Sequence, residues 1–216
     1  MTEDYFDFWS RMPPDAKVHP DDEPVFDRLR GDHSFDLDCL PLNFAGPLKT
    51  APVVLLFLSP GLSVGDVPFA ATREGRNHYA EQRTGVAPLP IDPSSLGHKW
   101  RQSRLKFLGD WQAHSDKIAT MNIGAYHSKD FSDHDVLASL PSSRAALNWA
   151  QSVLFPEAEA GKRCVICLRA ARYWGLRPGN VFGISLFAPR TNRSGHMLDD
   201  DIRSRAVRIA QDKMAE

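Results

Sequence analysis

The sequence predicts an α/β protein, built as a three-layer α/β/α sandwich around a mostly parallel, four-stranded central sheet. Two observations carry this prediction. Residues 53–58 (VVLLFL) are six consecutive apolar residues, a pattern typical of a strand that is buried on both faces. Three further apolar runs follow, separated by segments whose apolar residues have helical spacing. A chain that alternates strand and helix in this way favours a parallel sheet between helical layers.

The first half of the chain contains two of the expected strands, at residues 53–58 and within residues 117–126. Between them, residues 61–98 are rich in Gly, Pro, Ser and charged residues. We predict a long loop there, with one short helix at 73–85, and loops of this length are usually functional or disordered. Residues 99–114 place Trp and Leu side chains at helical spacing, so a helix is expected to lead into the second strand.

The second half repeats the alternation. The last helix begins with acidic residues, which the helix dipole favours in a first turn. Ser142 or Ser143 can cap the helix that precedes the third strand. The predicted helices are residues 141–155, 169–176 and 199–216, and the predicted strands lie within residues 162–168 and 181–189.

Residues 1–50 are expected to be an N-terminal helical and irregular extension of a single domain that spans residues 1–216. This segment is rich in proline and acidic residues. One short helix is predicted at residues 23–31, because Gly31 suits the position that follows a helix C-terminus.

The composition excludes several classes of protein. A net charge of -1, with 42% hydrophobic and 25% charged residues, is ordinary for a globular protein and gives no global argument for nucleic-acid binding. The chain shows neither a secretory leader nor an apolar run of the ~18 residues that a membrane span needs. We therefore expect a cytoplasmic, monomeric protein without a membrane partner, metal or cofactor.

The cysteines carry little functional signal. The chain has three, an odd and sparse count that argues against a disulfide framework. Cys164 and Cys167 have the spacing of a redox motif, but they lie inside an apolar run where alternation points them to opposite faces. We interpret them as small buried apolar side chains rather than as a redox pair or zinc ligands.

Four segments follow the predicted strands, and their chemistry should meet at one edge of the sheet, because ligands of such folds bind beyond the carboxyl ends of the strands. The first is SPGLSVGD, residues 59–66. Ser59, Pro60 and Gly61 offer a tight turn with backbone N–H groups, and Asp66 offers a carboxylate. The segment matches neither a Walker loop nor a dinucleotide fingerprint, and a plain turn is the alternative interpretation.

The second segment is MNIGAYHSKDF, which begins at the end of the second strand. Asn122 can both donate and accept hydrogen bonds through its amide. Tyr126, His127 and Ser128 add an aromatic ring, an imidazole and a hydroxyl. A polar turn with Tyr126 in the core is the structural alternative.

The third segment is RAARYWG, residues 169–175, and no role is assigned to its side chains. The fourth segment, APRTNRSGHML, is strongly polar after its first residues. Arg190, Asn192, Arg193, Ser194 and His196 lie within seven residues, and arginine and asparagine are natural contacts to phosphates and bases. The alternative is a solvated loop that only caps the last helix.

Taken together, these segments resemble the uracil-DNA glycosylase superfamily, of which this chain would be a divergent member, from about Val53 to Ala215. FLSPG matches the end of that family's first motif, and Asn122 stands where the family has a base-reading asparagine. CVICLRAARYWGL resembles its third strand and short helix, and FAPRTNRSGHML occupies the place of its last loop. Two positions depart from the family pattern. Ser59 replaces the usual Asp or Asn, and Ala188 replaces a His or Asn, for which Arg190 or His196 could substitute.

The resemblance implies a DNA glycosylase that flips a pyrimidine out of DNA and hydrolyses its N-glycosidic bond, in base-excision repair or in defence against phage. The departures suggest a modified pyrimidine, such as hypermodified cytosine. The implied roles are stacking on the base (Phe69 or Tyr126), base reading (Asn122), donation to the leaving base (His127, His196 or Arg190), orientation of the water (Asp66), phosphate binding (Ser59, Arg190, Arg193, Ser194) and a wedge (Met197, Leu198).

Two other readings stay open. The chain could be a DNA-binding protein that keeps the fold without the chemistry, which the changed motifs favour. It could also be an unrelated α/β enzyme that acts on a small nucleotide. The glycosylase reading requires that the loops starting at Ser59, Asn122 and Ala188 surround one cleft lined with positive charge.

Overall fold

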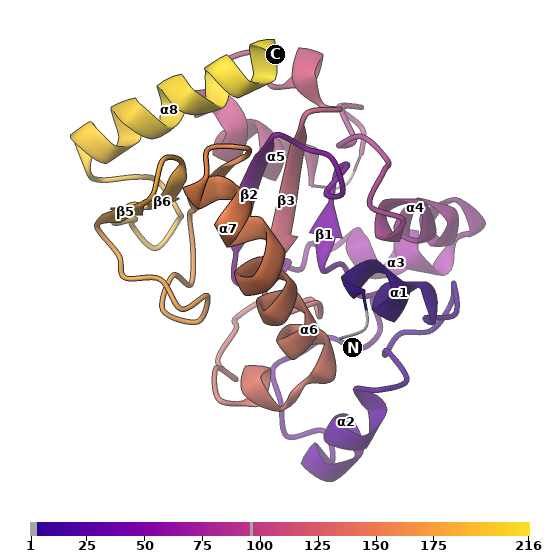
Figure 1. The fold of residues 1–216 in the computed structure, drawn as a ribbon. Helices are drawn as coiled ribbons and strands as arrows, with labels where there is room; N and C mark the ends of the chain where they lie inside the picture. Colours follow the sequence, from indigo (N-terminus) through magenta and orange to yellow (C-terminus); the bar gives the residue numbers. More distant parts are fainter. Residues whose placement is uncertain (1–3, 96) are drawn as a thin grey trace.

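The computed structural model describes residues 4–95 and 97–216, and it confirms an α/β fold (Figure 1). The sheet of the described residues has six strands in the order β1-β3-β2-β4-β6-β5, so the prediction of four strands is wrong. The inner strands β3, β2, β4 and β6 are mutually parallel, whereas β1 and β5 pair antiparallel at the two edges. The strands are β1 (Phe44–Ala45), β2 (Val53–Phe57), β3 (Ile118–Asn122), β4 (Cys164–Cys167), β5 (Asn180–Phe182) and β6 (Leu186–Ala188).

The two edge strands escaped the sequence prediction for different reasons. β1 is only two residues long, too short to show a periodic pattern. Residues 181–189 were predicted as one strand, but they form a hairpin of β5 and β6. The turn contains Gly183 at φ 56°, and a Cβ there would lie 2.5 Å from the backbone of Glu159. Only glycine fits this turn without displacing it.

The register of the sheet places apolar side chains alternately on its two faces. Val54 and Leu56 of β2 belong to one buried cluster, and Val53, Leu55 and Phe57 belong to another. All five residues are at most 4% exposed, as expected for a central strand covered on both sides.

Helices cover both faces of the sheet. The first cluster includes side chains of α1, α6 and α7, and the second includes side chains of α5 and α8. In Figure 1, α8 runs along the top of the molecule, while α6 and α7 stand in front of the strands. Ala206, Ala210 and Met214 bury one face of α8 at a spacing of four residues. The helices are α1 (Tyr5–Ser10), α2 (Glu23–Leu29), α3 (Asp66–Ala71), α4 (Arg73–Arg83), α5 (His98–Leu105), η1 (Lys106–Leu108), η2 (Gln112–His114), η3 (Val136–Ser139), α6 (Pro141–Trp149), η4 (Ala150–Leu154, a π-helix), α7 (Phe155–Glu159) and α8 (Asp200–Ala215).

Several predicted helices have different ends or do not form. Residues 61–98 contain a helix that was not predicted, α3, in addition to the predicted one, which is confirmed as α4. The helix predicted at 99–114 breaks into α5 and two 3-10 turns around Gly109, whose φ is 85°. Residues 169–176 form turns rather than a helix, with Ala170 in the left-handed region at φ 62°.

The cap predicted for α6 is also different. Leu140 holds the N-cap position and Pro141 follows it, so Ser142 and Ser143 lie within the first turn, where both are buried. The backbone N–H of Ser142 donates to Oδ1 of Asp22 at 3.0 Å. A carboxylate distant in the sequence therefore satisfies an N–H group that a serine cap would have bonded.

The described part of residues 1–50 is built into the core. Tyr5, Phe6 and Trp9 of α1 are buried in the first cluster, against Phe44 and Trp149. No helix among residues 4–95 and 97–216 is long and apolar enough to cross a bilayer.

Candidate functional site

The segments after β2 and β3 are joined to each other at the carboxyl edge of the sheet. Gly61 and Ser128 form a parallel bridge, and the N–H of Ser128 donates to the carbonyl of Pro60 at 3.3 Å. The Nδ1 atom of His127 lies 2.6 Å from the carbonyl oxygen of Gly61. Ser59 and Pro60 are half-buried, whereas Gly61 is exposed. The first two predicted segments therefore converge, as the strand assignment requires.

Asn122 is the last residue of β3 and pairs with Phe57, the last residue of β2. It is 8% exposed. Its side-chain amide donates to the carbonyl of Leu42 at 3.1 Å, and its own carbonyl accepts from the side chain of Asn43 at 2.9 Å. The chain before β1 thus fixes the orientation of the amide.

His127 and Asp66 form a buried polar pair between the two segments. Nδ1 of His127 lies 3.9 Å from Oδ2 of Asp66, and that oxygen also accepts from the backbone N–H of Ser63 at 2.5 Å. Burial lowers the pKa of His127, and the Gly61 carbonyl and Asp66 oppose the shift. A carbonyl can only accept, so Nδ1 carries the proton. In the neutral ring Nε2 is then an acceptor, and it is buried without a hydrogen bond of normal geometry among the described residues, although the backbone of Leu40 also acts to raise the pKa of the ring.

Of the two residues expected to stack on a base, Tyr126 is in the core. It is 0% exposed, and its ring lies 4.8 Å from that of Phe26. Its hydroxyl donates to Oδ2 of Asp22 at 2.6 Å and accepts from the N–H of His19 at 3.1 Å. Burial raises the pKa of Tyr126 well above its ordinary value. Only Phe69, half-buried on α3, keeps part of its ring accessible.

The segment after β6 folds back on itself as a closed loop. Thr191 bridges Met197, and the side-chain oxygen of Asn192 accepts the backbone N–H groups of Ser194 at 2.9 Å and His196 at 3.0 Å. Gly195, at φ 81°, brings the loop close to the carbonyl of Leu168. Asn192 therefore shapes the loop, while the side chains of Arg193 and Ser194 are exposed.

Three arginines from three elements meet at this loop. Nη1 of Arg104, on α5, donates to Nε2 of His196 at 3.0 Å, and Nη1 of Arg169, after β4, donates to the carbonyl of Arg193 at 2.7 Å. We call Arg104, Arg169, Arg193 and His196 the arginine cluster. Burial lowers the pKa of Arg169, and the charges of Arg104 and Arg193 lower it further. Among the described residues, none of the three arginines has a carboxylate partner.

Sequence reasoning missed Arg104 and Arg169. The segment after β4 was recognised as a strand exit, but its arginines received no role, and no pattern placed α5 beside the β6 loop. By contrast, Arg190 was predicted, and its guanidinium lies 3.6 Å from Asp199 in an exposed ion pair.

Two hollows lie beside the β4 and β6 segments. One, of about 480 Å³, is lined by Arg169, Tyr173 and Leu198 among others. The other, of about 610 Å³, is lined by Arg172 and Arg177. Arg190 lines both.

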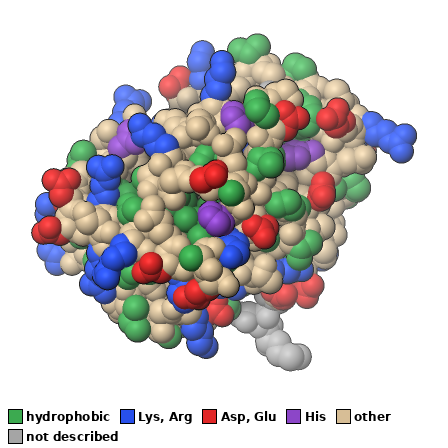
Figure 2. Space-filling view, turned by 90° about the horizontal axis from the view of Figure 1, so that it is seen from above, with side chains coloured by type: hydrophobic (Ala, Val, Ile, Leu, Met, Phe, Trp, Pro, Cys, Tyr) green, Lys and Arg blue, Asp and Glu red, His purple; other side chains and the backbone are tan. Residues whose placement is uncertain are grey.

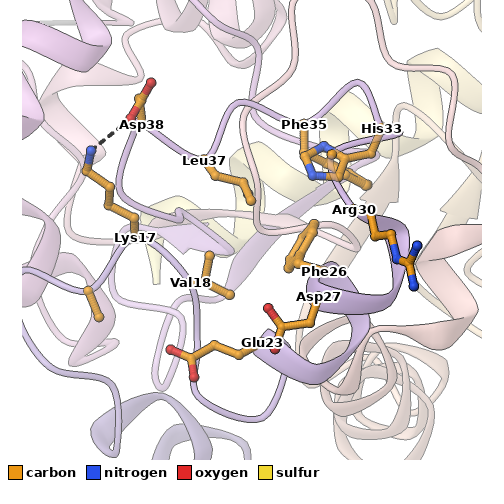
Figure 3. Close-up of a pocket in the computed structure, with 12 residues that line it drawn as sticks. Lys17, Val18, Glu23, Phe26, Asp27, Arg30, His33, Phe35, Leu37 and Asp38 are labelled. Carbon is orange, nitrogen blue, oxygen red and sulfur yellow. Dashed lines mark hydrogen bonds and ion pairs between the residues drawn. The ribbon is translucent and has the colours of Figure 1, made fainter.

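Ser59, Asp66 and Asn122 line neither hollow. The segments that follow the four inner strands lie at one edge of the sheet. The hollows beside the β4 and β6 segments are not lined by the predicted site residues Ser59, Asp66 and Asn122 of the β2 and β3 segments. A larger cavity, of about 850 Å³, lies elsewhere, among residues 16–38 (Figure 3).

Figure 2 shows the molecule from above, over α8, with Lys and Arg side chains interspersed among Asp and Glu. The arginine cluster has a different composition, because its three arginines meet without a carboxylate ion-pair partner among the described residues.

The structure also locates the cysteines and the possible metal-ligating side chains of the described residues. No group of three or more His, Cys, Asp or Glu side chains is placed to hold a metal ion in residues 4–95 and 97–216. Cys164 and Cys167 lie in the two different buried clusters, as predicted, and burial raises the pKa of each to about 12. They are inert core residues.

Comparison of the chain with protein-family models, with curated proteins and with solved structures found no match.

Proposed function

We propose that the chain is a DNA glycosylase that extrudes a pyrimidine from DNA and hydrolyses the bond between the base and the sugar. The observation that carries the proposal is the placement of Asn122. It ends β3 in register with the end of β2, and the segments that follow these two strands hold a buried imidazole and a carboxylate 3.9 Å apart, at the edge where such sheets bind ligands. The finer fold assignment, a glycosylase-like three-layer sandwich, belongs to the same proposal, as do monomeric state and cytoplasmic location.

The chemistry assigns separate roles to the buried polar groups. A water oxygen forms a bond with C1′ of the sugar, the C1′–N bond breaks, and its electron pair leaves with the base. Asp66 accepts the proton that the water loses. Asn122 bonds the polar edge of the base, and a hydrogen bond to the leaving anion contributes about 3 kcal/mol when the donor is fixed in advance.

His127 fits the role of a proton carrier. Its unpartnered Nε2 is an acceptor in the neutral ring, so protonation there would supply a donor for the leaving base. A small movement of the Gly61 loop is required, because His127 is 4% exposed and Asp66 is 7% exposed. Flipping enzymes commonly tighten their site around an extruded base.

The arginine cluster supports the DNA part of the proposal. Guanidinium groups from three elements, without carboxylate partners among the described residues, gather at the loop after β6 and are suited to phosphates. Leu198 is 59% exposed at the base of the same loop, where it can enter a base stack.

The direct test is abasic-site formation. End-labelled duplexes and single strands that contain uracil, 5-hydroxymethylcytosine or glucosylated cytosine are incubated with the protein and then treated with alkali. We expect strand breaks at one modified pyrimidine, reduced about 100-fold by Asn122→Ala and by His127→Gln. Asn148→Ala, an exposed asparagine of α6, is the matched control and should keep full activity. No breaks on any substrate would contradict the glycosylase assignment.

A DNA-binding protein without chemistry is the second candidate, and one observation favours it. The polar groups of the β2–β3 pair are already engaged, Asp66 with Ser63 and Asn122 with Leu42, and the family's catalytic His or Asn position is the fully buried Ala188. This candidate predicts retention of DNA in a gel together with no abasic sites on the whole substrate panel.

A further inference from the structure

The cavity of about 850 Å³ lies outside every element invoked for DNA. A single stretch of chain, residues 16–38, lines it, comprising the approach to α2, α2 itself and the segment that follows (Figure 3). None of the residues assigned to the glycosylase site is part of its lining. The cavity therefore needs an explanation of its own.

Apolar side chains line part of this cavity, together with charged and polar ones. Val18, Phe26, Phe35 and Leu37 line it, and the rings of Phe26 and Phe35 lie 5.7 Å apart. Both rings also pack on Tyr126, so the wall is rigid and belongs to the main core. Apolar side chains of a ligand would lose water on entering such a hollow, which favours binding.

The rim of the cavity carries unpaired negative charge. Lys17 and Asp38 neutralise each other across 2.9 Å, as the dashed line in Figure 3 marks. Glu23 and Asp27 stand one turn apart on α2, both exposed, and neither has an ion pair or a side-chain hydrogen bond among the described residues. Like charges at this spacing destabilise a helix, so a cation between them would relieve the repulsion.

Two other side chains that line the cavity, Arg30 and His33, bear on what it could bind. In Figure 3 the guanidinium of Arg30 points away from Glu23 and Asp27, so it does not neutralise them. Nδ1 of His33, in the same wall, is buried without a hydrogen-bond partner among the described residues. A turn of the ring would offer this atom to a polar group of a ligand.

We propose that this hollow binds a short basic segment of a partner protein. A Lys or Arg side chain of the segment pairs with Glu23 and Asp27, and a neighbouring apolar side chain packs against Val18, Phe26 and Leu37. Charge complementarity selects a cationic peptide over nucleic acid, whose phosphates the two carboxylates repel. The hollow is wide and open at its rim, which suits a peptide rather than the enclosed site of a small molecule.

The test uses the full chain and a fluorescein-labelled hexapeptide in which lysine alternates with leucine. Fluorescence anisotropy should show saturable binding that weakens as salt rises. A peptide with glutamate in place of lysine should bind at least about tenfold more weakly, and spermidine at equal concentration should not displace the lysine peptide.

The double variant Glu23→Gln with Asp27→Asn should weaken binding about fivefold, the loss expected for two exposed ion pairs. The control variant Glu74→Gln with Glu81→Gln removes the same charge from exposed positions of α4 and should bind as wild type does. Absence of saturation up to about 1 mM, equal binding of the glutamate peptide, full displacement by spermidine, or equal losses in both double variants would each overturn the proposal.

Discussion

At the carboxyl edge of the sheet, the polar side chains that follow β2 and β3 are bonded differently from those that follow β4 and β6. Around β2 and β3, the polar side chains are buried and bonded to the protein itself, as Asn122 is to Leu42 and Asp66 is to Ser63. Around β4 and β6, the polar side chains are arginines that face solvent or each other. The polar side chains of the β2–β3 half are engaged by the protein itself, whereas the arginines of the β4–β6 half have no carboxylate partner among the described residues.

The difference arises from the neighbours of each half. The N-terminal segment lies against β3 and supplies hydrogen-bond partners for the residues that follow it. Asp22 accepts from Tyr126, the carbonyl of Leu42 accepts from Asn122, and the backbone N–H of Asp36 donates to the backbone carbonyl of His127 at 2.8 Å. The β4 and β6 exits have α5 and their own loops beside them, and these supply further arginines instead of acids. The bonded polar side chains thus lie at the β2–β3 end of the edge, and the arginines lie at the β4–β6 end.

The largest predicted effect is a loss of stability when the buried carboxylate of Asp22, which accepts hydrogen bonds near the β3 exit, is removed. Asp22→Ala removes the acceptor of both the Tyr126 hydroxyl and the Ser142 N–H. Because each would be left unsatisfied in the interior, the free energy of unfolding should fall by about 3 kcal/mol. Urea unfolding monitored by fluorescence measures the loss. Asp27→Ala, an exposed acid of the same helix, should change it by less than about 0.5 kcal/mol.

The next effect concerns the charged half. Replacing Arg104, Arg169 and Arg193 together by Gln should lower DNA affinity and reduce the slope of log affinity against log salt by about three, one for each phosphate contact. Stability should stay the same or rise, because mutual repulsion is relieved. Fluorescence anisotropy at several salt concentrations measures the slope. Arg208→Gln, exposed on α8, serves as control, and an unchanged slope in the triple variant would assign the cluster to something other than DNA.

A smaller effect distinguishes the halves by pH. Burial lowers the pKa of His127 in the folded protein, so below the ordinary value of about 6.5 the unfolded chain binds the proton more readily than the native state does. The stability that neutral His127 contributes is complete above that value and is lost as the pH falls toward the lower folded pKa. Asp66 and Asp36 oppose the shift and soften this loss.

The measurement is urea unfolding of wild type and His127→Gln at pH 7.5, 6.5, 5.5 and 5.0. The difference between the two proteins should shift steadily in favour of the variant as the pH falls. A difference that is constant over this range would show that the imidazole does not titrate differently in the two states.

The smallest effect is expected at the thiols. Burial raises the pKa of Cys39 to about 11 and that of Cys164 and Cys167 to about 12, so little thiolate is available. Iodoacetamide at pH 8 should leave all three unmodified in the native protein and alkylate all three in urea, as mass spectrometry can count. Rapid native alkylation of Cys167 would reveal opening of the β4 exit.

The sequence predicted the parts of the molecule that depend on local pattern. The apolar run at residues 53–58 and the acidic first turn of residues 199–216 were sufficient to place β2 and α8. The convergence of Gly61, His127 and Ser128 also followed from a general rule about strand exits.

The rest depends on contacts between distant segments, which no local pattern encodes. From the sequence, Tyr126 was expected to stack on a base. In the structure its hydroxyl donates a hydrogen bond to Asp22, more than a hundred positions away in the chain. Arg104 joins the β6 loop because α5 packs on one face of the sheet. The hairpin of β5 and β6 could not be separated from a single strand, since both are apolar and the turn is short.

The hairpin turn at Gly183 connects the loop that follows β6 to the end of α7. A side chain there would press on the end of α7, and the displaced turn would pull on β6, whose three residues span only about 10 Å. Arg190 and the loop that follows begin at the other end of that strand. The position of that loop therefore depends on a contact at the far end of β6, between the hairpin turn and Glu159.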